Sequence, residues 1–151
     1  MAGLWSEEPE FMEEFSETIL NCMSAFPRKI VHTDELTRTC ELTYAEIQLL
    51  AMLSSGPASV EDAARTLCVA KTNLAILTRH LHELGYVLRI TNPKDKRKLI
   101  LKLTIQGMEK YEEVRNAVGS QLKRLVASFS KDEIVELIAA VRVLNGVLSQ
   151  A

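Results

Sequence analysis

The sequence has few aromatic residues and lacks the long apolar segments of membrane and secreted proteins. Aromatic residues make up only 5% of its 151 residues. No apolar run approaches the roughly 20 residues that a membrane-spanning helix needs, and the acidic N-terminal segment does not look like a signal peptide. We therefore expect a cytoplasmic protein with no membrane partner, folded as a single unit over residues 1–151.

Cysteine is also scarce, and its spacing fits neither a disulfide scaffold nor a zinc site. Cys22, Cys40 and Cys68 are odd in number and far apart, which argues against a disulfide scaffold and against a zinc knot. We expect reduced, buried thiols. Cys22 is the possible redox residue, although its apolar neighbours favour a buried structural role. His80 and His82 point to different sides of one predicted helix, so no metal site is expected.

Motifs for catalysis are missing as well. The sequence contains no GxSxG, no HExxH, no phosphate-binding glycine-rich loop and no paired acid and base signature. We therefore expect no enzymatic activity and no cofactor.

Charge is distributed unevenly, although the formal net charge is only −2. Nine of the 18 Lys and Arg residues lie between residues 65 and 102, where only Glu83 and Asp95 are acidic. The N-terminal part of the chain is instead acidic. Because phosphate contacts need local positive charge, this division predicts one face for a polyanion and another for a different partner.

Amphipathic helices are predicted at both ends of the chain. In residues 7–30 apolar residues recur at three- and four-residue steps, and Pro27 kinks this helix or ends its regular part. A long helix over residues 105–129 and a last helix after a Ser130–Glu133 capping box show the same period. Their apolar stripes exceed what one small domain can cover. Residues 7–30 and 105–149 are therefore expected to be dimerisation helices, and packing within a monomer is the alternative.

Two shorter helices are predicted in the middle of the chain. A capping box formed by Thr43 and Glu46 opens a largely buried helix over residues 44–54. Ser59 is a good N-cap for a short helix that runs to Leu67.

A further helix over residues 70–84 follows a tight break at Cys68 and Val69, and Gly85 is placed as its left-handed C-terminal residue. Together with the preceding helix it predicts a helix-turn-helix. Its inward side is expected to carry Leu74, Leu77, Leu81 and Leu84, and its more exposed side Lys71, Asn73, Thr78, Arg79 and His82.

The period then changes from helix to strand. Residues 86–90 and 98–103 predict two strands, joined by a turn region at residues 92–95. A basic β-hairpin directly after a helix-turn-helix is a wing. The predicted fold is thus mainly α with a small β-hairpin wing (α+β): a winged helix-turn-helix over residues 43–103, flanked by N- and C-terminal dimerisation helices.

The helix and the wing together provide candidate contacts to double-stranded DNA. Lys71 and Asn73 are placed to reach base edges or phosphates in the major groove, and the Thr72 hydroxyl is placed to contact a phosphate. An arginine on a thin hairpin suits a narrow minor groove, and Asp95 is positioned to orient Arg97. The candidate DNA-binding residues are Lys71, Thr72, Asn73, Arg79, Lys94, Asp95, Lys96, Arg97 and Lys98.

The wing sequence also resembles a known family. The run Asn92-Pro93-Lys94-Asp95-Lys96-Arg97, followed by Leu103-Thr104-Ile105-Gln106-Gly107, is similar to the wing signature of MarR-family regulators. This resemblance implies a homodimeric repressor whose two recognition helices enter successive major grooves of a pseudo-palindromic operator. It also implies that Asp95 and Arg97 are the characteristic pair of the wing. It further implies release of DNA by a small-molecule effector or by oxidation of a cysteine.

Three positions depart from the family pattern. Asn92 replaces an Asp, a change that the wing should tolerate. Ala70 stands where a capping Ser is common, and Ile76 stands where an Arg is frequent, so operator preference and phosphate contacts are expected to differ. Ala70, Ile76 and the acidic net charge leave an alternative open, a winged-helix module that binds proteins and has lost DNA binding. A second alternative is a thiol-based redox-sensing regulator.

Overall fold

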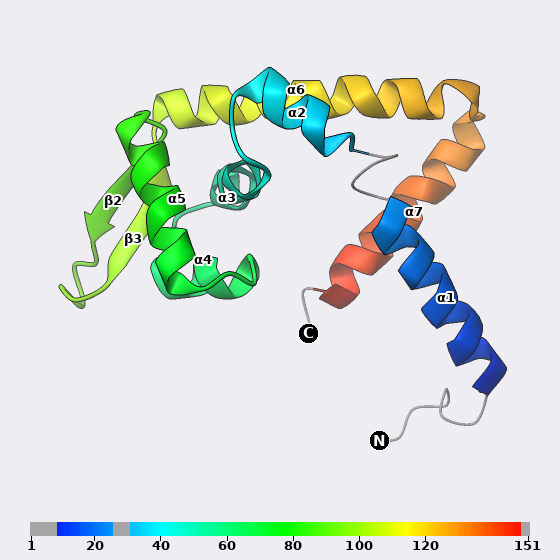
Figure 1. The fold of residues 1–151 in the computed structure, drawn as a ribbon, viewed down its shortest axis with the longest axis horizontal. Helices are drawn as coiled ribbons and strands as arrows, with labels where there is room; N and C mark the ends of the chain where they lie inside the picture. Colours follow the sequence, from blue (N-terminus) through cyan, green and yellow to red (C-terminus); the bar gives the residue numbers. More distant parts are fainter. Residues whose placement is uncertain (1–8, 26–30, 149–151) are drawn as a thin grey trace.

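The computed structural model describes residues 9–25 and 31–148, which form α-helices and one small antiparallel sheet (Figure 1). In chain order the elements are α1 (Pro9–Ala25), α2 (Thr33–Cys40), α3 (Tyr44–Ser54), β1 (Ala58–Ser59), α4 (Val60–Thr66), α5 (Lys71–Glu83), β2 (Val87–Thr91), β3 (Leu99–Leu103), α6 (Ile105–Leu125), a 3₁₀ helix (Val126–Ser128) and α7 (Lys131–Leu148). None of the helices in this part of the chain is long and apolar enough to cross a membrane.

The long helix α6 connects two parts of the molecule (Figure 1). Helices α3, α4 and α5 and the sheet gather at the N-terminal end of α6, and α2 packs along its side. Helix α7 turns away from the far end of α6. Helix α1 also lies at that end, away from α3, α4, α5 and the sheet. The predicted mainly α architecture with a β-hairpin wing is confirmed.

The core lies where α3 and α5 pack against the sheet, and α2 extends it by packing against α3 and α6. Leucines from all three helices and from β3 are almost fully buried, and each stabilises the fold by about 1.5 to 3 kcal/mol relative to an exposed position. The largest fully buried side chains of the core include Leu36, Leu49, Leu50, Leu74, Leu81, Leu101 and Val87.

The predicted helix starts are confirmed by their hydrogen bonds. The Glu46 carboxylate accepts a bond from the backbone N–H of Thr43 at 2.8 Å, while the Thr43 hydroxyl accepts one from the N–H of Glu46 at 3.3 Å. Ser130 and Glu133 make the same reciprocal pair before α7. Ser59 caps α4 by accepting from the N–H of Asp62 at 3.0 Å. These local contacts satisfy backbone donors that the first turn of a helix leaves free.

The hairpin is also confirmed, with β2 and β3 pairing from Val87↔Leu103 to Thr91↔Leu99. The sheet has a third strand, β1, which pairs with the other edge of β3 and gives the order β1-β3-β2. This strand has only two residues, Ala58 and Ser59, and so carries no alternation that a sequence pattern could reveal.

The N-terminal region differs from the prediction of one helix over residues 7–30. Helix α1 ends at Ala25, and Phe26, Pro27 and Ile30 lie outside the described residues. The separate helix α2 was not predicted, because only two of its eight residues, Leu36 and Cys40, are buried. Two apolar positions in so polar a helix do not define a stripe. The tertiary contact with α6 therefore supplies the main packing of this helix.

The hairpin is fixed to α6 by a close contact that we call the β3–α6 junction, formed by Gly85, Tyr86, Thr104 and Gly107. The Thr104 hydroxyl donates to the Gly85 carbonyl at 2.6 Å and accepts from the N–H of Gly107 at 2.8 Å. The Thr104 N–H donates to the Tyr86 carbonyl at 3.0 Å. Gly107 is buried against the Tyr86 backbone, so the junction has no room for a side chain there.

Candidate nucleic-acid interface

The turn between α4 and α5 sets the direction of the predicted recognition helix. Cys68 adopts a left-handed conformation with φ 53°, and its N–H donates to the Arg65 carbonyl at 3.1 Å. The next N–H, of Val69, donates to the Ala64 carbonyl at 3.0 Å. Ala70 then starts α5 in an extended conformation without any side-chain cap. The departure at Ala70 therefore has a structural consequence, since the first N–H groups of α5 receive no bond from a capping side chain.

The outward face of α5 carries the predicted contacts of the recognition helix. Thr72, Asn73 and Arg79 are exposed there, and Lys71 is exposed at the start of the helix on the side toward α4. Lys71 pairs with Glu61 of α4, with 3.5 Å between Nζ and Oε1, across the helix-turn-helix. Because this pair is exposed it is weak, and Lys71 is able to exchange the carboxylate for a phosphate.

Thr78 is a correction to the predicted exposed side of this helix. The side chain is only 2% exposed, and its hydroxyl donates to the Ala75 carbonyl at 3.2 Å. Thr78 lies one turn after Leu74 on the same side of α5, and both residues are buried. Leu84, predicted to face inward, is instead 41% exposed at the end of the helix. The buried stripe of α5 is thus shifted relative to the prediction.

The tip of the wing is organised by two side-chain acceptors. Asn92 Oδ1 accepts from the N–H of Lys94 at 2.9 Å, which an Asp at this position would do equally well, so the wing tolerates this departure. Asp95 Oδ1 accepts from the N–H of Arg97 at 3.1 Å and lies 3.6 Å from its Nε. The Arg97 side chain is 95% exposed, so Asp95 orients a guanidinium that otherwise extends into solvent.

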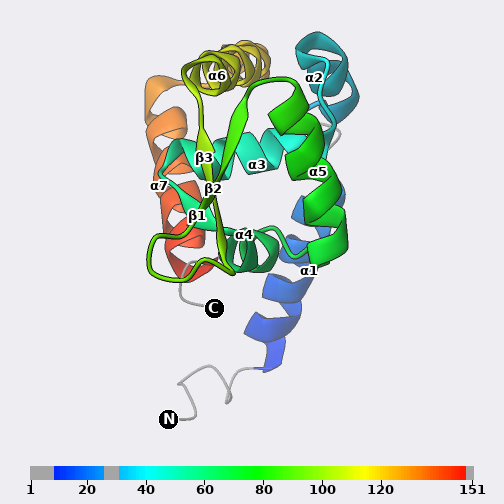
Figure 2. The ribbon, with the colours of Figure 1, turned by 90° about the vertical axis from the view of Figure 1, so that its left-hand side faces the viewer.

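The two cationic elements lie at one end of the winged part. Figure 2 shows the first turn of α5 and the hairpin tip on either side of α4, both at the end away from α6. Lys94, Lys96 and Lys98 are exposed at this tip beside Arg97. The structure therefore brings Lys71, Thr72 and Asn73 to the same end of the molecule as the wing residues. Arg79 lies two turns further along the outward face of α5.

A contact that sequence reasoning missed connects α5 to α3. His80 Nδ1 lies 2.5 Å from Oε1 of Glu46, a residue that is only 3% exposed. The same carboxylate belongs to the Thr43 capping box, so its two oxygens join the start of α3 to the middle of the recognition helix. We call Thr43, Glu46 and His80 the α3–α5 brace. The local sequence predicted the Thr43–Glu46 capping box but not the contact of Glu46 with His80.

The brace makes stability depend on pH. Burial raises the pKa of Glu46, but bonds from His80 and Thr43 outweigh burial and hold it below 4.5. The hydrogen bond and charge of Glu46 raise the pKa of His80 above 6.5. The stabilisation of the fold by His80 is therefore complete below pH 6.5 and is lost as the pH rises through the folded-state pKa of His80. The stabilisation of the fold by Glu46 is present above pH 4.5 and is lost as the pH falls through the folded-state pKa of Glu46.

We expect His80→Gln to lower the melting temperature most between about pH 4.5 and 6.5, where both partners of the wild-type pair are charged. The difference from wild type should narrow toward pH 8 as His80 loses its proton. Thermal denaturation followed by circular dichroism across this range measures the effect. His82→Gln is the control, because His82 Nδ1 bonds the Val87 carbonyl and no carboxylate partner is lost. A gap for His80→Gln that is the same at every pH would contradict the brace.

The cysteines depart from the expected burial. Cys40 is buried, whereas Cys22 and Cys68 are exposed and all three are free thiols. Burial raises the pKa of the Cys40 thiol, and the Glu113 carboxylate raises it further, so this thiol is held in its unreactive protonated form. The buried structural role expected for Cys22 is not what this single chain shows. The redox role of Cys22 stays a prediction.

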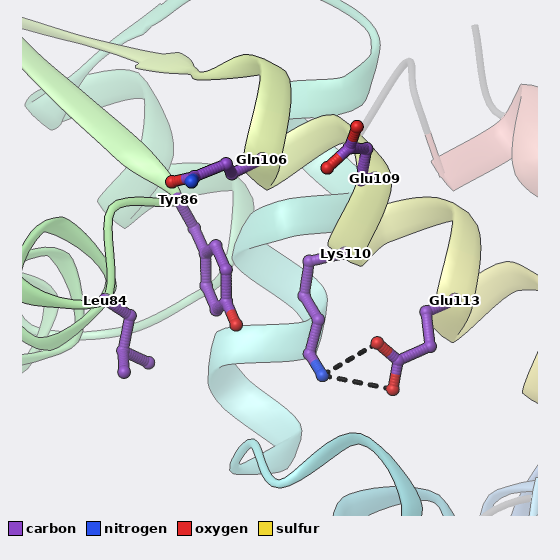
Figure 3. A pocket seen from close by; sticks show the side chains of 6 residues that line it. All are labelled: Leu84, Tyr86, Gln106, Glu109, Lys110 and Glu113. Atoms are coloured by element: carbon purple, nitrogen blue, oxygen red, sulfur yellow. Dashed lines mark hydrogen bonds and ion pairs between the residues drawn. The ribbon is translucent and has the colours of Figure 1, made fainter.

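One pocket lies between the winged part and α6 (Figure 3). Its volume is about 370 Å³, and it is lined by Leu84, Tyr86, Gln106, Glu109, Lys110 and Glu113. Lys110 Nζ lies 2.9 Å from Oε2 of Glu113 on the same helix. Burial alone lowers the pKa of Lys110, but the bond and charge of Glu113 outweigh it and raise that pKa above 10.5. The pocket thus presents a fixed ion pair beside the Tyr86 ring.

Within the described residues no group of three His, Cys, Asp or Glu side chains is arranged to hold a metal ion. His80 and His82 are each engaged with a different partner, Glu46 and the Val87 carbonyl. The chemistry that the described surface offers is instead that of cations and hydrogen-bond donors on α5 and the wing.

Residues 42–107 match the family of winged helix DNA-binding domains. The chain is 28% identical over 91 residues to the HTH-type transcriptional regulator FarR of Neisseria gonorrhoeae, covering 60% of this chain and 61% of that protein. It is 24% identical over 97 residues to the homoprotocatechuate degradative operon repressor of Escherichia coli, covering 64% of this chain and 66% of the repressor. These matches span just under two thirds of either relative.

The same fold is found in a solved structure. Wild-type apo MarR from Escherichia coli aligns with a TM-score of 0.72 and 22% identity over 85% of this chain and 94% of that one. Because the identity is low, the likeness establishes the fold alone.

Proposed function

We propose that the protein is a sequence-specific regulator of transcription. Residues 42–107 match the winged helix DNA-binding domains, and the fold is that of MarR. The protein binds a pseudo-palindromic operator as a homodimer and acts as a ligand-responsive repressor, by binding and without catalysis. Residues 43–103 are the DNA-binding region, and the helices within residues 7–30 and 105–149 form the dimer interface.

The observation that carries this proposal is the common position of the first turn of α5 and the wing tip. Both elements expose cations at the end of the winged part that lies away from α6 (Figure 2). A helix of this kind fits the major groove, and a thin hairpin with an exposed arginine suits the adjacent minor groove. The net charge of −2 does not oppose this, because the cations are concentrated on these two elements.

Dimerisation is supported by the apolar surface at the far end of α6. Every residue of α7 except Ile134 is exposed, although most of that helix is apolar. Exposed large apolar side chains on α1 and α7 include Met12, Leu20, Met23, Val135, Ile138, Val141, Leu144 and Leu148. Monomeric soluble proteins rarely leave so extended an apolar surface uncovered, and a second copy covers it symmetrically. The mass in solution should then be twice 16.9 kDa.

We propose the pocket of Figure 3 as the site of the effector. A small molecule there contacts α6 on one side and Leu84 and Tyr86, at the end of the recognition helix, on the other. If its affinity differs between two orientations of the winged part, its binding shifts the population between them. The spacing of the two recognition helices in the dimer changes accordingly.

The salt dependence of DNA binding tests the proposal. If Lys71, Lys94, Lys96 and Lys98 each neutralise one phosphate in both halves of a dimer, log K should fall with log salt with a slope of about −7. Fluorescence anisotropy with promoter fragments from the source genome measures this slope. Lys96→Ala should reduce the slope by about 2 in the dimer, one unit for each subunit.

Lys131→Ala is the matched control for this titration, because Lys131 is exposed at the start of α7, far from the winged part. Its slope should equal that of wild type. The alternative, a winged-helix module that binds proteins, gives no sequence-specific binding to any fragment at any salt concentration.

A further inference from the structure

Ile76 is an exposed apolar residue on the recognition helix that contact with phosphates does not explain. It is 62% exposed, whereas the buried side of α5 is formed by Leu74, Thr78 and Leu81. Thr72, Ile76 and Arg79 follow one another at helical spacing and form the stripe opposite that buried side. Ile76 therefore stands at the middle of the outward face, where a helix in a groove approaches the base pairs most closely.

Neither helix stability nor core packing explains an isoleucine at this position. A β-branched side chain is a weaker helix former than Lys, Glu or Gln, because its χ1 freedom is restricted against the preceding turn. Leaving it exposed also forgoes the free energy that burial of an isoleucine supplies. Within the described chain nothing covers most of this side chain.

The surroundings of Ile76 identify the kind of surface that would cover it. Its neighbours one helical turn away, Thr72, Asn73, Arg79 and His80, are all polar and exposed, so Ile76 is an isolated apolar point in a polar and cationic face. The buried centre of a protein interface is more apolar than the surface around it, and no exposed apolar neighbour one turn away on α5 extends Ile76 into such a centre. The DNA major groove combines phosphates with one isolated apolar group, the 5-methyl group of thymine.

We propose that Ile76 is a specificity-determining residue that packs on the 5-methyl group of a thymine in each half of the operator. The proposal rests on the function proposed above and deepens it, because it names a base that the operator contains. Ile76 reads the methyl group by apolar contact, while the flanking Thr72 and Arg79 contact phosphates or base edges. This is the position at which the family pattern often has Arg, so the proposal predicts a different operator preference at the base pair that it contacts.

The experiment starts with selection of bound sequences from a random pool of duplexes by the full-length wild-type protein. Each thymine of the selected operator is then replaced singly by deoxyuridine, which keeps the base pairing and removes only the methyl group. Loss of one buried methyl group should weaken binding by about fourfold, and symmetric replacement in both halves by about 15-fold. Fluorescence anisotropy measures Kd for wild type, Ile76→Ser and the conservative Ile76→Val.

The expected result is one symmetry-related thymine position at which wild type and Ile76→Val discriminate against deoxyuridine and Ile76→Ser does not. Discrimination that survives in Ile76→Ser would assign the methyl contact to another residue and overturn the proposal. So would the absence of any position sensitive to deoxyuridine, or an unchanged affinity of Ile76→Ser, which would leave Ile76 facing something other than DNA. Failure to select any sequence would instead refute DNA recognition itself. Circular dichroism of Ile76→Ser verifies that this exposed substitution leaves the fold intact.

Discussion

Arg97→Ala is expected to weaken operator binding by about 1 to 3 kcal/mol, which is roughly a 5- to 150-fold rise in Kd. The reason is the geometry of the wing tip. The Arg97 side chain is 95% exposed, and Asp95 Oδ1 accepts from the Arg97 backbone N–H at 3.1 Å and lies 3.6 Å from its Nε. An arginine presented in this way gains the negative potential of a narrow minor groove. Anisotropy titration with the selected operator measures the change.

Two further variants separate this role from a general loss of charge. Arg97→Lys keeps the charge but loses the planar guanidinium that Asp95 orients, so its affinity should lie between those of wild type and Arg97→Ala. Arg38→Ala removes the same charge from α2, which packs along α6, and should leave Kd unchanged. Because Arg97 makes its contacts only at the exposed tip, the melting temperature should not change. An Arg97→Ala titration curve that coincides with that of wild type would exclude a DNA contact by this residue.

The features that the sequence predicted correctly are those that neighbouring residues determine. The Thr43–Glu46 and Ser130–Glu133 boxes each close within four residues. Gly85 adopts the predicted left-handed conformation, with φ 79°. These motifs need only the backbone of their own turn, and the strand pattern around the wing is similarly local. Their positions could therefore be predicted without knowledge of any distant contact.

The features that were missed depend on packing between distant segments. His80 bonds Glu46 across 34 residues, and only the packing of α3 against α5 brings them together. Thr78 is polar and was placed on the exposed side, but the buried stripe of α5 includes it. Helix α2 carries two buried residues and packs against α6, which its short polar sequence does not reveal. In each case the tertiary contact outweighs the local signal.

The candidate DNA contacts could be predicted only in part from the sequence. Their exposure could be predicted because charged side chains stay at the surface, and the helix-turn-helix followed by a hairpin brings the first turn of α5 and the wing to one end of the fold. Which base each one reads depends on how α5 is docked in the groove, and that requires the partner duplex. Ile76 illustrates the difference, since the sequence marked it as a departure and only its exposure made it a candidate base reader.

Gly107→Ala is expected to destabilise the fold strongly, through a clash at the β3–α6 junction. A Cβ at this position would lie 2.0 Å from the Tyr86 carbonyl oxygen and 2.9 Å from the Tyr86 carbonyl carbon. Both obstructing atoms are backbone, and the same carbonyl accepts the Thr104 N–H bond, so no side chain can rotate to relieve the clash. We expect a loss of about 3 kcal/mol, at the upper end of the range for overpacking, and a fall in melting temperature of roughly 6 to 12 °C.

A second glycine in the same helix provides the control. A Cβ on Gly119 would have no atom within 4 Å, so Gly119→Ala should raise stability by about 0.5 to 1 kcal/mol, the ordinary gain of alanine over glycine in a helix. Opposite signs at two positions of α6 would attribute the loss at Gly107 to the β3–α6 junction and not to helix propensity. Because this junction fixes the hairpin to α6, Gly107→Ala should also weaken operator binding below its melting temperature, where Gly119→Ala should not. A Gly107→Ala protein that unfolds at the wild-type temperature would show that the junction can open by the width of a methyl group, and the wing would then not be held rigidly against α6.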